Sequence, residues 1–240
     1  SRLAPFIFSN DETAIFAFSN GRLDVFNSSG VAIQTNITSN CNWTTATIFE
    51  LNIAQFGDTV FVCHRDYPIR KIVRASASSF SVSAFAFEEN DSVTAHSVNK
   101  TTQPFYKYAD SSITLTPSAT SGASVTVTAS ASVFEDAHDE TYLEIGGKQV
   151  YITSKDSATQ VTVKVIETLG GTSAEADWTE QLISGVRGYP QAVSFHDNRL
   201  WFGGVRDKPS SVVASQIGGY FNFALGTGLA NEAINVAITG

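Results

Sequence analysis

The sequence predicts an all-β protein made of propeller-like antiparallel sheet modules, with a small β barrel or sandwich domain inserted among them. Three observations lead to this fold class. Apolar and polar residues alternate with a period of two along much of the 240-residue chain. Gly, Asn and Asp interrupt these runs at short-strand spacing. The charged fraction is 16%, against roughly 25% for an ordinary globular protein, and β-branched and aromatic residues are abundant.

Residues 1–104 are expected to form the first part of the propeller-like modules. Two short strands flank the polar turn Ser9–Thr13. Asn20-Gly21 then predicts a tight hairpin, because both residues tolerate positive φ. Strands at Glu50–Ala54 and Thr59–Cys63, divided by Gly57-Asp58, repeat the plan.

Three windows of the chain share one pattern: Phe6–Phe18, Ile53–Cys63 and Ala192–Phe202. Each is a strand, a polar turn with Asp or Asn, and a strand that carries aromatic residues. A pattern repeated without identity is typical of propeller blades. Residues 185–240 are therefore predicted to continue the modules that the N-terminal region begins.

Residues 105–184 have a different character, with Ser, Thr and Val alternating in place of the aromatic pattern. Tyr142–Ile145 and Gln149–Thr153 predict a hairpin about Gly146-Gly147. We expect a self-contained barrel or sandwich inserted at a loop, which requires its two ends to lie close together. Only Ser173–Leu182 has weak helical potential, and an extended linker there is the alternative.

Composition excludes several classes of function. The net charge of −8 argues against tight nucleic-acid binding, but not against a surface that nucleic acid passes. No apolar run of about 18 residues predicts a membrane span, and no signal peptide opens the chain. Cys41 and Cys63, assigned to different strands, are expected as buried thiols, with a disulfide as the alternative. The absence of Met and the strand-like run at 234–238 suggest a piece of a longer polypeptide.

No constellation in the sequence predicts a catalytic, cofactor-binding or metal-binding residue. Glu135–Glu140 is acidic, but it lacks the spacing of a calcium loop and is expected to be an exposed turn. The cysteines and histidines lack zinc-site spacing. His196-Asp197 is better explained as part of a tight turn, with Asn198 at positive φ, than as part of a triad.

Seven residues are predicted to have structural or interface roles: His64, Arg65, Asp66, Tyr67, Arg199, Trp201 and Tyr220. The first four form a rigid inter-strand loop or, as the alternative, an inter-subunit contact. Arg199 and Trp201 lie two apart, so the guanidinium is expected to pack on the ring, with Trp201 as a core anchor of its sheet. Tyr220 belongs to an aromatic cluster that closes the module.

Several motifs together resemble one family. They are Arg2–Phe6, Leu51–Gln55 with Asp58, His64–Pro68 with Arg70-Lys71, Gly188–Gly204, Ser215–Phe223 and Asn231–Ile234, and the inserted segment adds Ile145–Val150. In this order they resemble, over nearly the whole chain, large structural proteins of tailed bacteriophages, similar in role to podophage tail nozzle or tail tubular B proteins. Family members commonly carry an acidic pair where this chain has Asn231-Glu232.

The resemblance implies a non-enzymatic component of the phage tail in the virion. It implies a homo-oligomeric ring around a channel, contacts with other tail or adaptor proteins, passage of viral DNA without specific binding, no cofactor and no membrane. The alternative is a host-surface polysaccharide-binding module with the inserted domain as the reader. A glycan-cleaving tail enzyme is a third possibility; it needs two carboxylates about 5–9 Å apart, and no feature of the sequence nominates a pair.

Overall fold

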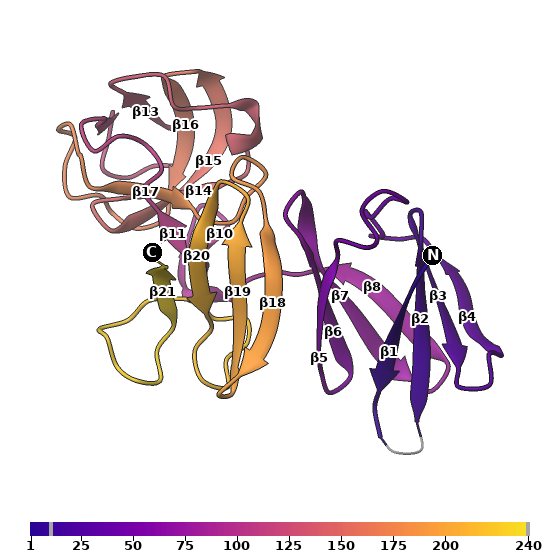
Figure 1. Cartoon of the computed structure of the whole chain (residues 1–240). Coiled ribbons are helices and arrows are strands. Elements are labelled where there is room, and N and C mark those ends of the chain that lie inside the picture. Colours follow the sequence, from indigo (N-terminus) through magenta and orange to yellow (C-terminus); the bar gives the residue numbers. More distant parts are fainter. Residues whose placement is uncertain (10–11, 239–240) are drawn as a thin grey trace.

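The computed structural model describes residues 1–9 and 12–238, and over these residues the chain is all-β, as predicted. All strand pairs are antiparallel (Figure 1). In the described residues the helical structure is limited to one 3₁₀ turn, η1 (Asp136–His138). No helix among them is long and apolar enough to cross a membrane.

Three four-stranded meanders make up most of the molecule, each with its strands in sequential order. The first meander contains β1 (Arg2–Ile7), β2 (Thr13–Ser19), β3 (Arg22–Asn27) and β4 (Ala32–Ile37). The second contains β5 (Asn52–Phe56), β6 (Thr59–His64), β7 (Tyr67–Ser76) and β8 (Ser79–Ala84). The third contains β18 (Pro190–His196), β19 (Arg199–Val205), β20 (Lys208–Ala214) and β21 (Ile234–Ala237).

The three windows that share a sequence pattern become the first hairpins of the three meanders, β1–β2, β5–β6 and β18–β19. Asp197 and Asn198 both adopt positive φ, 50° and 55°, as the predicted tight turn requires. The Asn20-Gly21 hairpin is also confirmed, with Gly21 at a φ of 60°. The predicted Ser9–Thr13 turn includes residues 10 and 11, which lie outside the described residues.

The meanders stand in a row, with the second between the first and the third (Figure 1). Aromatic rings fill both gaps. Phe16 of β2 packs 5.7 Å from Phe80 of β8, and Phe61 of β6 packs 5.5 Å from Phe195 of β18. Each meander therefore buries one face against its neighbour, as stacked antiparallel sheets do.

Amide side chains of β5 connect the first strands of the three meanders. Gln55 Nε2 donates to the carbonyl of Ile7 in β1 at 2.7 Å, and its Oε1 accepts the Ile7 N–H at 3.1 Å. Asn52 Oδ1 accepts the N–H of Val193 in β18 at 2.9 Å. These bonds satisfy backbone groups at strand edges, and they bring β1, β5 and β18 next to one another.

A seven-stranded sheet takes all its strands from residues 105–181, in the order β11-β17-β14-β15-β16-β13-β12. The strands are β11 (Phe105–Tyr106), β12 (Leu115–Pro117), β13 (Val125–Ala129), β14 (Tyr142–Ile145), β15 (Lys148–Ser157), β16 (Gln160–Val165) and β17 (Trp178–Gln181). A separate two-stranded hairpin, β9 (Glu89–Ala95) and β10 (Val98–Thr101), precedes it.

The seven-stranded sheet curls. Leu115, in the edge strand β12, exchanges two backbone hydrogen bonds of 2.9 and 2.8 Å with Glu175, close to β17 near the other edge. The chain enters the sheet on β11 and leaves on β17, and these two strands are paired. The weak helical potential of Ser173–Leu182 is not realised. Tertiary pairing overrides it, because β17 joins β14 and buries Trp178, whose Nε1 donates to the carbonyl of Ile113 at 2.8 Å.

Both cysteines are free and buried, as expected. Cys63 lies in β6, but Cys41 lies in the loop after β4 rather than in a strand. The sequence around it turns the chain, since Asn40 adopts a φ of 60°. Burial raises the pKa of Cys41 to about 11 and also raises the pKa of Cys63.

Candidate functional site

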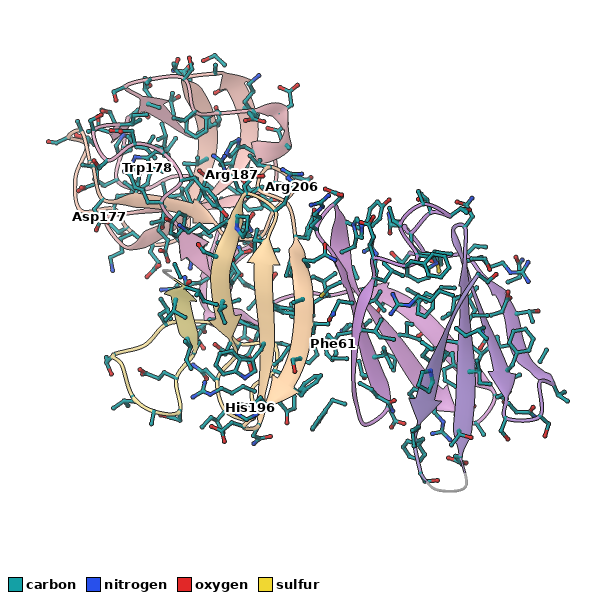
Figure 2. The ribbon with its side chains drawn as sticks, in the orientation of Figure 1. Phe61, Asp177, Trp178, Arg187, His196 and Arg206 are labelled. Atoms are coloured by element: carbon teal, nitrogen blue, oxygen red, sulfur yellow. The ribbon has the colours of Figure 1, made fainter. Side chains whose placement is uncertain are left out.

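Three segments meet where the second and third meanders approach the seven-stranded sheet: the β6–β7 turn, the loop before β18 and the β19–β20 turn (Figure 2). Tyr189 connects them, because its N–H donates to the carbonyl of Arg65 at 2.8 Å and its carbonyl accepts the N–H of Arg206 at 3.3 Å. The N–H of Asp207 donates to the carbonyl of Arg187 at 3.1 Å. We call this meeting point the junction.

Gly188 makes this close approach possible. Its φ is +82°, and a Cβ there would lie 2.4 Å from the Cβ of Arg206 and 3.0 Å from the carbonyl oxygen of Arg65. Any side chain would meet both strain and a clash. The motif Gly188-Tyr189-Pro190 is thus explained by packing between turns.

His64 locks the β6–β7 turn. Its buried ring stacks on Tyr67 with centroids 4.7 Å apart, and its Nδ1 accepts the N–H of Asp66 at 3.2 Å. Since Nδ1 is an acceptor, Nε2 carries the proton and donates to Glu50 at 3.2 Å. These contacts hold residues 64–67 as a turn between β6 and β7, and the alternative role of these residues in an inter-subunit contact stays a prediction. The side chain of Arg65 is 58% exposed.

A buried ion pair joins the junction to the seven-stranded sheet. Arg187 donates two hydrogen bonds to Glu180 of β17, at 2.9 and 2.7 Å, and Glu180 also accepts from His138 Nε2 at 3.2 Å. Nδ1 of His138 accepts the Glu135 N–H, so the proton lies on Nε2. The Arg187 guanidinium lies 4.5 Å from the ring centre of Tyr108, whose pKa is raised by burial.

A groove of about 570 Å³ lies beside the junction, between the second and third meanders. Its charged side chains are Glu50, Arg65 and Arg206. Glu50 already pairs with His64, and Arg206 pairs with Asp207 at 2.9 Å, a hydrogen bond that raises the pKa of Arg206. Among the described residues no group of His, Cys, Asp and Glu is arranged to hold a metal ion.

The predicted residues Arg199, Trp201 and Tyr220 lie at the opposite end of the third meander, near His196 in Figure 2. The buried guanidinium of Arg199 donates to the carbonyls of Ser215, Ala230 and Glu232 at 2.5–2.6 Å. Among the described residues, the contacts of the Arg199 guanidinium are these carbonyl groups, and the expected packing on Trp201 is not among the cation–ring contacts. The loop after β20 folds over the start of β19. Its carbonyl groups have no partner in a strand, and they accept the hydrogen bonds of the guanidinium.

Trp201 is not the core anchor that the sequence predicted. Leu200 and Phe202 are buried in the core shared with the second meander, so the residue between them points to the other face of β19. Trp201 is half-buried there, and its Nε1 donates to the carbonyl of His196 at 3.0 Å. The aromatic pattern identified the strand correctly but assigned the wrong face.

Tyr220 ties the second meander to the third. Its ring centre lies 4.6 Å from Phe56 and 5.5 Å from Phe195, and its hydroxyl donates to Asn198 Oδ1 at 2.5 Å. The predicted aromatic cluster is confirmed. It lies between sheets that are about 140 residues apart in the chain, since Phe56 and Phe195 belong to β5 and β18.

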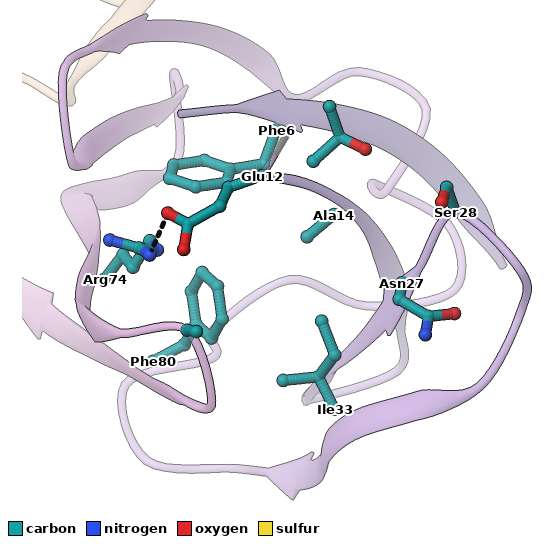
Figure 3. A pocket seen from close by; sticks show the side chains of 10 residues that line it. Phe6, Glu12, Ala14, Asn27, Ser28, Ile33, Arg74 and Phe80 are labelled. Atoms are coloured by element: carbon teal, nitrogen blue, oxygen red, sulfur yellow. Dashed lines mark hydrogen bonds and ion pairs between the residues drawn. The ribbon is translucent and has the colours of Figure 1, made fainter. Parts of the chain in front are cut away.

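A smaller pocket of about 290 Å³ opens between the first and second meanders (Figure 3). Phe6, Phe80 and Ile33 form its apolar wall. Arg74 at its mouth binds the Glu12 carboxylate at 2.5 Å and lies 4.1 Å from the ring centre of Phe8. The cation is thus neutralised within the protein, which leaves little electrostatic attraction for an anionic ligand.

The acidic segment Glu135–Glu140 forms a turn around η1. Asp136 pairs with Lys155 at 2.8 Å and Asp139 accepts the Lys155 N–H at 2.5 Å, whereas His138 is buried in the ion-pair cluster described above. The predicted exposed turn is confirmed except at His138. The carboxylates hold a neighbouring strand, which is an alternative to cation binding.

The sequence predicted no role for Glu180 or Arg187, and it placed Asn52 and Gln55 in the motif Leu51–Gln55 without assigning either a contact. The signals that could have found them are local: Asn52 and Gln55 are amides in a strand, and Arg187 precedes a Gly-Tyr-Pro turn. No family model matches the chain, and no curated protein sequence matches it either.

Proposed function

We propose that this protein is a structural component of a bacteriophage tail, of the nozzle or tail-hub type, that surrounds the DNA exit channel. The proposal is supported above all by one observation: three similar meanders stand in a row with their first strands linked by Asn52 and Gln55. A row of sheets of this kind is suited to forming the wall of a channel. The buried polar groups of the protein bond one segment of the chain to another.

The same observation supports a propeller-like arrangement. Propeller blades are four-stranded antiparallel sheets that radiate from a central channel with their first strands innermost. Here every meander has four strands in sequential order, and the edge strands β1, β5 and β18 lie side by side. Each pair of neighbours buries aromatic rings between faces.

The seven-stranded sheet corresponds, in this proposal, to the inserted barrel or sandwich of residues 105–184. Its ends are adjacent on β11 and β17, which an insertion into a loop requires. The Leu115–Glu175 bridge brings the two sides of the curled sheet together. The buried Arg187–Glu180 pair would then fix the orientation of the inserted domain.

Charge is compatible with transient passage of DNA. The chain carries 15 Lys and Arg against 23 Asp and Glu. Several of the cations near the junction are paired with carboxylates, which leaves few to grip phosphates. A non-binding wall allows a genome to pass without being retained.

Electron microscopy of the phage particle, with this chain located by a bound antibody fragment, tests the proposal. We expect a ring of identical chains on the tail axis, in contact with other tail or adaptor proteins. Purified protein should not retard duplex DNA at physiological salt. Release of sugars from host polysaccharide, abolished by replacing one Asp or Glu, would instead establish a tail enzyme.

A polysaccharide-binding role is the second candidate, and a pocket of about 430 Å³ beside the seven-stranded sheet favours it. Phe105 and Phe223 line it together with the polar side chains of Lys100 and Gln149, a combination typical of ligand sites. Burial raises the pKa of Glu144 in the same wall. Phe105→Ala, at a half-buried position of the wall, should weaken polysaccharide binding if this candidate is correct, and peripheral trimers in the particle would support it.

A further inference from the structure

The second strand of each of the three meanders carries an aromatic residue that is paired with a small residue on the first strand. The pairs are Phe16 with Ala4, Phe61 with Ala54, and Trp201 with Ser194. A small cross-strand neighbour leaves room for the ring to project from the sheet. The meanders thus share a feature beyond their strand order.

The rings of Phe16 and Phe61 each contact the next meander in the row. Phe16 reaches from the first meander to Phe80 of the second, and Phe61 reaches from the second meander to Phe195 of the third. Trp201 projects from the third meander in the equivalent direction. The cross-strand neighbour of Trp201, Ser194, is exposed, and the Trp201 ring is only half-buried.

Beside Trp201, on the side away from Arg199, the sheet face is apolar. Gly203 of β19 pairs with Val212 of β20, which pairs with Val236 of β21, and Val236 is 50% exposed. This row lies beside Trp201 on the same face of the meander, because residues two apart on a strand share a face. We call this face, with Trp201, Val212 and Val236, the forward face.

The opposite end of the row presents the complementary face. Val60 and Val62 of β6 are buried in the core shared with the first meander, and Leu200 and Phe202 of β19 occupy the same two register positions against the second. In β2 the residues that flank Phe16, as Val60 and Val62 flank Phe61, are Ile15 and Ala17, which pair with Pro5 and Leu3. We call this the rear face of the first meander.

The exposed apolar side chains of the rear face lie on β1, whereas Ile15 is half-buried and Ala17 is buried. Leu3 is 66% exposed and Ile7, on the same side of β1, is 60% exposed. Exposed apolar rows on a sheet face mark a contact surface. Among the described residues of one chain, therefore, no further meander packs on the forward face of the third meander, and no further meander packs on the rear face of the first.

We infer that the forward face of one copy docks on the rear face of a second copy, with Trp201 of one packed on Leu3 and Ile15 of the other. The contact continues the two intersheet contacts that already exist within each chain. A head-to-tail contact of this kind closes into a ring when the rotation between units permits. Two copies bring six meanders, within the range of about four to eight blades that propellers use. This inference rests on the propeller-like arrangement proposed above.

The 240-residue chain tests the inference directly by light scattering after gel filtration. We expect a dimer of twice 25.7 kDa at micromolar concentration. Trp201→Glu and Leu3→Glu should each give monomers with unchanged circular dichroism, since neither side chain is fully buried. Phe49→Glu, at a 70% exposed position in the loop between β4 and β5, is the matched control and should stay dimeric.

Mixing the two monomeric variants distinguishes head-to-tail docking from pairing of like faces. A mixed pair contains one interface with both substitutions and one with neither, so dimers should reappear on mixing. A dimer of Leu3→Glu alone would show pairing through the third meander and overturn the inference. A monomeric wild type would also overturn it, whereas the tail role would survive because microscopy locates the chain in the particle independently.

Discussion

The cores of the meanders and of the seven-stranded sheet are filled by different residue types. Between the first and second meanders the core contains Phe6, Phe16, Phe18, Trp43 and Phe80. Inside the seven-stranded sheet Val, Ile and Leu dominate, with one Phe and one Trp among the buried residues. Rings suit a gap of about 10 Å between two separate sheets, while branched residues suit the narrower interior of a sheet that curls on itself.

The difference means that each region has a core of its own. The regions are joined by the polar contacts of the junction and by Tyr106, Tyr108, Leu182 and Ile183, which pack into the core between the second and third meanders. Buried residues of the seven-stranded core all lie between Leu115 and Trp178. The Arg187–Glu180 pair and the Tyr189 backbone bonds connect that region to the meanders. Substitutions should therefore affect one region at a time unless they strike the junction.

Excision of residues 105–184 is the most drastic way to test this independence. The isolated segment should fold, because the core of the seven-stranded sheet is formed by its own residues. We expect a dispersed amide spectrum and a single cooperative melt. A disordered spectrum would show that the meanders are needed to hold the curled sheet.

Phe16→Ala should have the largest effect of any single substitution, a loss of about 3–5 kcal/mol, because it removes a fully buried ring from a core of stacked rings. Hydrogen exchange followed by mass spectrometry should show faster exchange in peptides from residues 1–84. Peptides from 115–178 should keep their protection. Val163→Ala is the matched change in the other core, with the opposite regional pattern and a smaller loss of about 1–3 kcal/mol.

Glu180→Leu should cost about 3 kcal/mol, since it removes both hydrogen bonds between Arg187 and a carboxylate and leaves only Asp207, at 4.0 Å, beside the half-buried guanidinium. Unlike the core substitutions, it should raise exchange in the loop before β18 and in β17 together. The double variant Glu180→Leu/Arg187→Met should recover part of the loss, because no unpaired charge remains. Denaturant titration of the three variants measures this, and a double variant worse than the single one would contradict the assigned pairing.

The sequence predicted the strands better than it predicted their faces. The period-two runs and the Asn-Gly and Gly-Gly turns located the hairpins, because these signals are local. It did not reveal that Trp201 faces outward, since Leu200, Trp201 and Phe202 are all apolar and alternation cannot choose among them. Arg187 with Glu180 escaped prediction for a related reason: the pair depends on the meeting of a loop and β17, which no spacing encodes.

Gly188→Ala should have the smallest of these effects, yet it tests the junction most specifically. The new methyl group would face the Cβ of Arg206 at 2.4 Å in a backbone of positive φ, so we expect a loss of about 2 kcal/mol. Gly147→Ala is the control, because Gly147 also has positive φ, +70°, but nothing lies within 4 Å of its Cβ position. It should lose about 1 kcal/mol from backbone strain alone. Thermal melts of the two variants separate strain from the clash, and equal losses would show that the turns at the junction can move apart freely.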